Sequence, residues 1–310
     1  MLHDVPEDVR GDDDPWTRLR GAVGRAAGAG AGDQDERGQP GQRSTKNGSH
    51  HWNGKDDGYH SQIDAVTATG VELAYGRRTV LAAATFTVPQ GGVTALIGPN
   101  GSGKSTLLSA IAGLLPPRSG VLEVPAASRR GGVAYVLQAT RVNEHLPLTV
   151  RETVTMGRYA ATGPWRRLRA GDRAAVDAAL DAVAISDLAR RPLRELSGGQ
   201  RQRAFVAQGL AQGADVLLLD EPITGLDVVS RQHILDAIAA ERAAGRTILV
   251  STHDLGDAAA ADHLLLLAGR VVASGPADQV LTDTNLAAAY GGHLLRIGDR
   301  TLILDDHPHH

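Results

Sequence analysis

Four short segments of the chain are largely apolar, and polar residues follow each of them at once. They are Val93–Ile97, Val133–Leu137, Val216–Leu219 and Thr247–Thr252. Runs of this kind, separated by stretches with helical periodicity, predict a parallel sheet that is covered on both faces. Ligands of such sheets bind at the carboxyl ends of the strands. The pattern therefore predicts an α/β protein in which four strand endings converge on one site.

The chain changes character at about residue 63. Residues 1–62 are rich in Gly, Asp, Arg, Ser and His and have almost no aliphatic periodicity, which predicts a disordered tail. From Ile63 onward the segments are short and β-rich, with alternation in Thr85–Val88 and a turn signal at Gly76–Arg78. We expect an antiparallel subsheet at the start of a folded domain that spans 63–290.

The stretch between the second and third apolar segments is of a different kind. It lacks an evident strand, and Asp172–Leu188 has apolar residues at helical spacing. A further amphipathic helix is expected through Phe205, with Ser197 and Gln200 spaced as a capping box at its start. We interpret residues 139 to about 205 as an inserted helical subdomain.

The C-terminal extension, 291–310, has strand-like alternation from Leu294 to Leu304 around Gly298–Asp299, which predicts a hairpin. Eight of the 12 histidines lie in the two tails of the chain, 1–62 and 291–310. Histidine-rich tracts can bind transition metals, and a solvated tail without a ligand is an equally good interpretation.

Composition narrows the function classes. The chain has 310 residues, 42% of them hydrophobic, and a net charge of −3. It therefore lacks the overall positive charge that favours binding to nucleic acid. It has no cysteine, which excludes disulfides and thiolate metal sites. Its apolar runs, such as Leu264–Ala268, are far shorter than the ~20 residues of a membrane-spanning helix. The sequence also offers no signal peptide, and we expect a soluble chain.

Residues Gly98–Thr106 read GPNGSGKST and fit the pattern of a phosphate-binding loop between a strand and a helix. Its glycines allow the backbone N–H groups to surround a polyphosphate. Lys104 would reach the β- and γ-phosphates, and the hydroxyl of Ser105 would ligate Mg²⁺. The alternative, an ordinary glycine-rich turn, does not explain the Lys-Ser pair.

The other strand endings carry matching chemistry. Asp220 would supply a Mg²⁺ ligand, directly or through water, and the adjacent Glu221 would polarise an attacking water. Gln138 could complete the metal shell and His253 could bind the γ-phosphate, although either residue alone is more often an ordinary loop residue. Tyr75 could stack on a base or be a plain strand tyrosine.

These motifs, with LSGGQ at 196–200, VLLLDEP at 216–222, Leu226–Asp227 and STHD at 251–254, resemble the ATP-binding subunits of ABC transporters over roughly 64–290. The resemblance implies a P-loop NTPase (ABC ATPase) core with an antiparallel β subdomain and an inserted helical subdomain. It implies ATP and Mg²⁺ as cofactors, with Glu221 as catalytic base, His253 as switch, and Ser105, Gln138 and Asp220 around the metal. The implied nucleotide-binding residues are Tyr75, Gly98, Pro99, Asn100, Gly101, Ser102, Gly103, Lys104, Ser105, Thr106, Gln138, Ser197, Gly198, Gly199, Gln200 and Asp227.

The resemblance also implies partners. Two cassettes would pair head to tail as a homodimer, with the phosphate loop of one facing LSGGQ of the other around each ATP. A separate permease would dock near residues 139–160, with an extracytoplasmic binding protein in the same system, which places the chain at the cytoplasmic face of the membrane.

The residues after Gln138 and the segment 222–227 look most like those of zinc or manganese importers, zinc first. Ferric-siderophore or cobalamin importers are the alternative, and a soluble non-transport ABC ATPase is a more distant one.

Overall fold

The computed structural model describes residues 64–138, 147–163, 165–291, 294–297 and 300–303. The tail predicted at 1–62, the first part of the predicted permease-docking segment and the C-terminal histidines lie outside the described residues. None of the helices within the described ranges is both long and apolar enough to cross a membrane.

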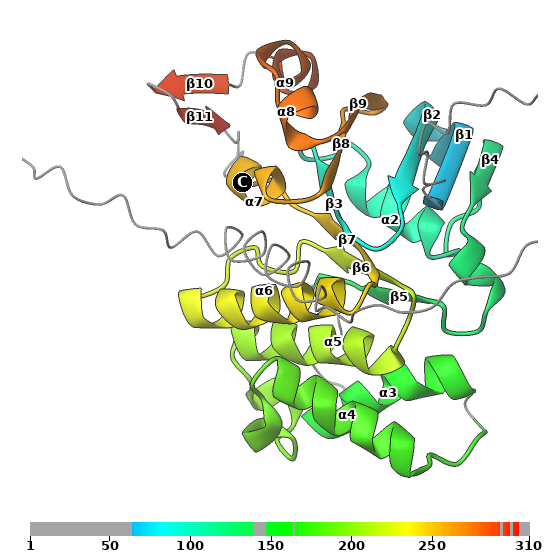
Figure 1. Cartoon of the computed structure of the whole chain (residues 1–310), viewed down its shortest axis with the longest axis vertical. Helices are drawn as coiled ribbons and strands as arrows, with labels where there is room; N and C mark the ends of the chain where they lie inside the picture. Colours follow the sequence, from blue (N-terminus) through cyan, green and yellow to red (C-terminus); the bar gives the residue numbers. More distant parts are fainter. Residues whose placement is uncertain (1–63, 139–146, 164, 292–293, 298–299, 304–310) are drawn as a thin grey trace, which may run out of the picture.

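The main sheet has six strands in the order β5-β6-β7-β3-β8-β9 (Figure 1). Its strands are β3 (Val93–Ile97), β5 (Val133–Val136), β6 (Val216–Asp220), β7 (Thr247–Ser251), β8 (His263–Leu267) and β9 (Val271–Gly275). Neighbouring strands from β5 to β8 are parallel, and β9 is antiparallel to β8. The predicted parallel sheet is confirmed, and β8 and β9 extend it beyond the prediction.

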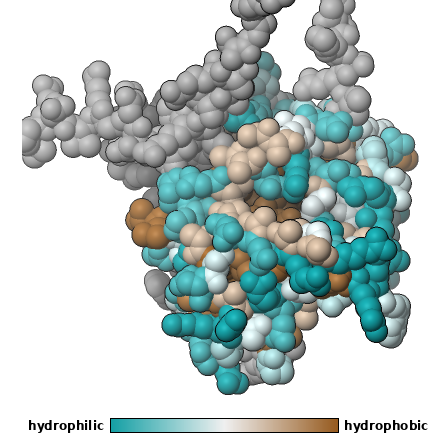
Figure 2. All heavy atoms as spheres, turned by 60° about the horizontal axis from the view of Figure 1, so that its bottom comes forward, coloured by the Kyte–Doolittle hydropathy of each residue, from teal (hydrophilic) through white to brown (hydrophobic). Residues whose placement is uncertain are grey.

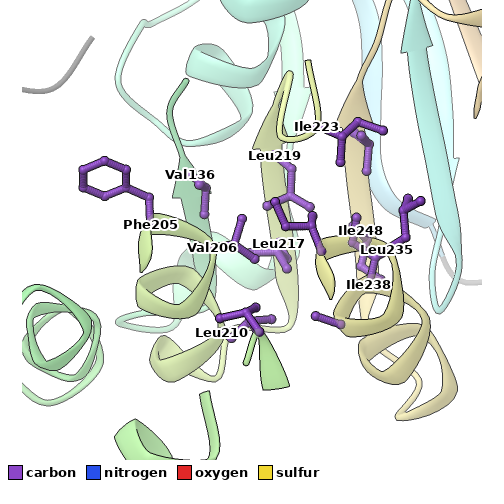
Figure 3. Close-up of a cluster of buried hydrophobic side chains, with 14 of the residues drawn as sticks. Val136, Phe205, Val206, Leu210, Leu217, Leu219, Ile223, Leu235, Ile238 and Ile248 are labelled. Carbon is purple, nitrogen blue, oxygen red and sulfur yellow. The ribbon is translucent and has the colours of Figure 1, made fainter. Parts of the chain in front are cut away.

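Helices cover both faces of the main sheet. The helices are α2 (Lys104–Ile111) on one face, and α5 (Gly198–Gln212) and α6 (Val228–Ala243) on the other. Successive strand residues point to opposite faces: Leu218 packs in a cluster with Leu107 of α2, whereas Leu217 and Leu219 pack in a second cluster with Val206 of α5. Figure 3 shows this second cluster, where side chains of β6 lie between those of α5 and α6.

A second sheet is antiparallel, with the order β2-β1-β4. It consists of β1 (Asp64–Tyr75), β2 (Arg78–Pro89) and β4 (Ser119–Glu123), after which a short 3-10 helix, η1 (Pro125–Ser128), follows. Tyr75 pairs with Arg78 across the turn that the sequence predicts. Buried Leu73 and Leu81 pack in the same cluster as residues of α2, so this sheet lies against the helix that follows the phosphate loop.

The insertion between β5 and β6 is helical. It contains α3 (Val150–Thr162), α4 (Ala170–Ala182), two 3-10 turns, η3 (Ser186–Leu188) and η4 (Leu193–Glu195), and then α5. These helices form the lower part of Figure 1, and the predicted α/β class with a helical insertion is confirmed.

The helix predicted over Asp172–Leu188 is wrong at its C-terminal end, because α4 stops at Ala182. Ala184 adopts a left-handed backbone with φ of 51°, which breaks the helix. Arg203 of α5 donates to the carbonyl oxygens of Val183 and Ala184 at 3.1 and 2.9 Å. A side chain about twenty residues away therefore stabilises the interruption.

The C-terminal part of the chain adds α7 (Leu255–Ala259), α8 (Ala277–Val280) and α9 (Asp283–Tyr290). Beyond them, β10 (Leu294–Ile297) and β11 (Arg300–Ile303) pair antiparallel in the segment where the sequence predicts a hairpin.

Candidate functional site

The loop between β3 and α2 is shaped by its glycines. Gly98 has φ of 146°, and a Cβ atom there would lie 2.0 Å from the carbonyl oxygen of Leu267. Gly103, with φ of 106°, is the N-cap of α2 and provides no side-chain cap. The first turn of α2 therefore has no side-chain cap from its N-cap residue, and the helix dipole favours negative charge at this end.

Lys104 is buried at the first position of α2. Its Nζ donates to the carbonyl oxygens of Gly98 at 2.7 Å and Pro99 at 3.2 Å, so the ammonium group lies over the loop. Ser102 is also buried, and its Oγ has no hydrogen-bond partner within the described part of the chain. A buried hydroxyl without such a partner, in the same loop as a buried ammonium group, fits a loop that holds a phosphate group.

Asp220 is the last residue of β6 and is almost fully buried. Its Oδ1 accepts hydrogen bonds from Ser105 Oγ at 2.9 Å and Ser251 Oγ at 2.7 Å, and its Oδ2 accepts one from Tyr135 OH at 3.3 Å. A hydroxyl and a carboxylate at this separation are the oxygen ligands that Mg²⁺ prefers. The residues present therefore fit a magnesium ion next to the phosphate loop.

Glu221 follows Asp220 in a left-handed conformation, with φ of 48°. Few residues other than glycine adopt this conformation, and strain of this kind is common at functional sites. The N–H of Glu221 donates to Ser251 Oγ at 2.8 Å, and Gln138 Nε2 donates to Glu221 Oε2 at the long distance of 3.5 Å. The structure thus brings Gln138, Glu221 and Asp220 together at the carboxyl edge of the sheet.

Comparisons with known proteins agree with this geometry. The ABC transporter family model matches residues 81–224. The "Manganese transport system ATP-binding protein MntA" of Synechocystis is 41% identical to the chain over 239 residues, which are 75% of this chain and 92% of that protein. The chain belongs to the ATP-binding proteins of ABC transporters. As a member of this family it binds ATP and is an ATPase.

Two further similarities support the assignment. The "Zinc transport system ATP-binding protein TroB" of Treponema pallidum is 40% identical over 240 residues, which cover 76% of this chain and 88% of that protein. The ADP conformation of MJ1267, an ATP-binding cassette of an ABC transporter, superimposes with a TM-score of 0.63 at 26% identity and covers 74% of this chain and 99% of that one.

The remaining strand-end residues of this ABC ATPase are exposed. His253 follows β7 by two residues and faces solvent, and the next residue, Asp254, caps α7 by accepting the N–H of Asp257. Tyr75 is 55% exposed at the end of β1. Thr106 is buried within α2, whereas Asn100 and Gly101 face solvent at the tip of the loop.

The LSGGQ segment begins α5 with the predicted capping box. Gln200 N–H donates to Ser197 Oγ at 3.2 Å, and Ser197 N–H donates to Gln200 Oε1 at 3.0 Å. Gly199 lies against the start of α6, where a Cβ would be 2.7 Å from Asp227 Oδ2. Gly198 has open space around it.

Asp227 is the N-cap of α6 and accepts the N–H of Ser230 at 2.8 Å. This backbone hydrogen bond, with a further one from the Ser230 side chain, lowers the pKa of Asp227 below its ordinary value. Since α2 and α5 lie on opposite faces of the main sheet, LSGGQ and the phosphate loop begin helices on different sides of it.

Two residues of the site were given no role from the sequence, although Ser251 lies in the STHD motif. Tyr135 lies within β5, and Ser251 is the last residue of β7; each hydrogen-bonds to Asp220. One sequence signal could have found Ser251: it is a polar residue at the carboxyl end of an apolar strand. The same signal identified Asp220.

Proposed function

We propose that this ABC ATPase powers the uptake of a transition-metal ion, zinc or manganese, across a membrane. The observation that carries the proposal is the convergence of Lys104, Ser105, Asp220 and Glu221 at one sheet edge. Support for the cargo class comes from the similarity to manganese and zinc transport proteins, which does not separate the two metals.

The phosphate loop binds the nucleotide through charge and backbone amides. Lys104 contacts the β- and γ-phosphates, and the N–H groups at the start of α2 donate to phosphate oxygens. Ser105 and Asp220 would hold Mg²⁺, and Gln138 would complete its shell. When bound, this ion neutralises charge that develops on the phosphates during transfer. Tyr75, exposed on β1, stacks on the adenine ring.

Glu221 acts as the catalytic base by accepting a proton from the attacking water. Its carboxylate is half-buried, and its backbone N–H is fixed by Ser251. His253 follows β7, the strand next to β6, and serves as the switch that hydrogen-bonds the γ-phosphate. Catalysis then rests on positioning and charge stabilisation without a covalent intermediate.

LSGGQ acts on the nucleotide of a second copy of the chain. Its helix starts at Gly198, where the backbone is open and amides can reach a phosphate. Since the phosphate loop of the same chain lies across the sheet, a head-to-tail homodimer completes both sites. Asp227, in contact with Gly199, lies between the two sites in this arrangement.

A groove next to α3 provides the docking surface for a separate permease. Its volume is about 260 Å³. It is mainly apolar and is lined by Tyr135, Val136, Leu137, Leu148, Thr153, Met156, Leu193, Phe205, Gln208, Gly209 and Gln212. Figure 2 brings the α3–α4 end forward and shows hydrophobic residues set among hydrophilic ones. An apolar groove with a polar rim fits a short amphipathic helix of a membrane protein.

This docking places the chain at the cytoplasmic face of the membrane. The permease carries the metal path, and an extracytoplasmic binding protein delivers the ion. Ferric siderophore or cobalamin remains the alternative cargo, with a soluble ATPase role as the distant one.

The proposal is tested by uptake of labelled zinc, manganese and ferric siderophore in cells that lack the gene. Wild-type and Lys104→Ala copies are returned on the same vector, and their protein levels are matched. We expect zinc or manganese uptake to be lost and then restored by the wild type alone. Loss confined to the siderophore would favour the alternative cargo, and unchanged uptake of all three would contradict the proposed transport role.

A further inference from the structure

The side chain of Ser251 joins two groups of the site. Ser251 ends β7, is fully buried and pairs in register with Asp220 of β6. Its Oγ lies 2.7 Å from Asp220 Oδ1 and 2.8 Å from the backbone nitrogen of Glu221. One oxygen atom thus contacts both the metal-holding carboxylate and the residue that carries the base.

The direction of both hydrogen bonds is fixed by chemistry. An ionised carboxylate only accepts, and a backbone N–H only donates. The single hydroxyl hydrogen of Ser251 therefore points to Asp220, and a lone pair of the same oxygen receives the N–H of Glu221. A hydroxyl satisfies both demands at once, whereas alanine satisfies neither.

The hydrogen bond from the Glu221 N–H to Ser251 matters because the other contact described for Glu221 is weak. Its φ of 48° lies where few residues other than glycine are found. The contact from Gln138 Nε2 to Glu221 Oε2, at 3.5 Å, is at the outer limit of a hydrogen bond. The bond to Ser251 is much shorter and acts on the backbone from which the carboxylate projects.

We propose that Ser251 is a positioning residue that fixes the backbone of Glu221 relative to Asp220, and so keeps the base aligned for attack on the γ-phosphate. Ser251 itself does not touch the nucleotide. The inference rests on the proposed roles of Asp220 and Glu221 in ATP hydrolysis. Without this hydroxyl the chain still binds ATP, but the base is displaced.

Thr247 provides a matched control on the same strand. It lies at the other end of β7, is buried, and its Oγ1 accepts the N–H of Gly91 at 3.0 Å. Thr247→Val removes a buried hydroxyl that accepts a backbone N–H, as Ser251→Ala does, but away from the nucleotide site. Comparing the two variants therefore separates a loss of stability from a loss of activity that is caused by a displaced Glu221.

The experiment measures kcat and KM for MgATP hydrolysis, ATP affinity and thermal unfolding for the purified full-length chain. We expect Ser251→Ala to lower kcat by roughly ten- to hundredfold, since small misplacements of a reacting group have effects of this size. We expect its ATP affinity to stay within about threefold, because the phosphate loop is untouched. Thr247→Val should lose similar stability and keep kcat within about twofold.

A folded Ser251→Ala protein with wild-type kcat would overturn the inference, as would equal losses of kcat in the two variants. If Ser251→Ala does not fold, Ser251→Cys decides, because a thiol fills the site but is a weak donor and acceptor. Its kcat should fall at least about tenfold, and a wild-type kcat would overturn the inference. Absence of MgATP hydrolysis by the wild type would instead contradict the proposed function itself.

Discussion

Lys104 and Glu221 lie in the same site, and in the proposed mechanism they act at different stages. Lys104→Ala removes the buried ammonium group over the phosphate loop, so we expect ATP binding and turnover to be lost. Glu221→Gln keeps the loop intact, and we expect it to bind ATP while turnover falls about 10²–10⁴-fold. Equilibrium binding of a fluorescent ATP analogue and phosphate release measure the two effects.

Glu123, exposed on β4, offers the control for this substitution. Glu123→Gln should keep wild-type turnover. Robust hydrolysis by Glu221→Gln would show that another group takes the proton from water.

The close packing of Gly98 against the backbone of Leu267 gives a second prediction at the residue scale. A Cβ there would meet the Leu267 carbonyl at 2.0 Å, so the backbone must shift. At Gly101, with φ of 76°, no atom lies within 4 Å, and alanine meets only the left-handed strain of about 1–2 kcal/mol. We expect Gly98→Ala to lower the free energy of unfolding well beyond Gly101→Ala in urea titrations. Equal losses would show that the close contact has no cost.

Local sequence accounts for part of the site. The phosphate loop and the Asp220–Glu221 pair could be predicted because each is a contiguous motif beside a strand. The position of Ser251 at the end of an apolar strand marks it as a candidate, but its contact with Asp220 could not be predicted, and neither could that of Tyr135. These contacts span 31 and 85 residues and depend on the strand register. A single polar residue in a strand carries no sign of its neighbour across the sheet.

At the scale of elements, most strands with a strong apolar signal were predicted and the weaker ones were missed. The exception is β8, which is strongly apolar and was not expected as a strand. The fully buried strands β3, β6 and β7 were expected. By contrast β4 is mostly exposed and β9 only partly buried, so neither shows a clear pattern of apolar residues. The end of α4 was misplaced because Arg203 of α5 stabilises it from outside the segment.

In the proposed dimer, the cap of α5 has a role beyond its helix. Ser197→Ala removes the hydroxyl that accepts the Gln200 N–H and should lower the free energy of unfolding by about 1 kcal/mol. Thr282→Ala removes an equivalent cap from α9 and should have a similar cost. We expect only Ser197→Ala to lower ATP turnover, measured beside chemical unfolding. Equal turnover in both variants would argue that LSGGQ serves only as a helix start.

The junction of α3, α4 and α5 gives a pH-dependent prediction. The Arg169 backbone N–H and the Arg158 guanidinium lower the pKa of Asp172 below its ordinary value. Its contribution to stability is therefore complete above the unfolded-state pKa and is lost as the pH falls through the lowered folded-state value. We expect the stability difference between wild type and Asp172→Asn to shrink from neutral pH to about pH 2.

Asp177 is the control for this effect, because its pair with Arg151 is exposed. Asp177→Asn should change stability little at any pH, as measured by urea unfolding. A wild-type advantage over Asp172→Asn that persists undiminished in acid would show that the carboxylate charge is not what stabilises the junction.

At the scale of the whole molecule, the main sheet separates the two segments that we propose as halves of a shared nucleotide site. The phosphate loop opens at the start of α2, and LSGGQ opens at the start of α5 on the other face. The class of fold could be predicted because strand and helix periodicities alternate along the chain. The separation across the sheet could not, since it follows from strand order, which crosses from β5 through β7 to β3.

The central claim is that two copies of the chain complete two ATP sites. Its most direct test is the molecular mass of the Glu221→Gln protein in solution, measured with and without MgATP. We predict twice the monomer mass with MgATP and the monomer mass without it, because the unhydrolysed nucleotide joins the phosphate loop of one copy to LSGGQ of the other. The double variant Lys104→Ala/Glu221→Gln should remain monomeric in both conditions. A Glu221→Gln protein that is saturated with MgATP and still monomeric would contradict the shared site.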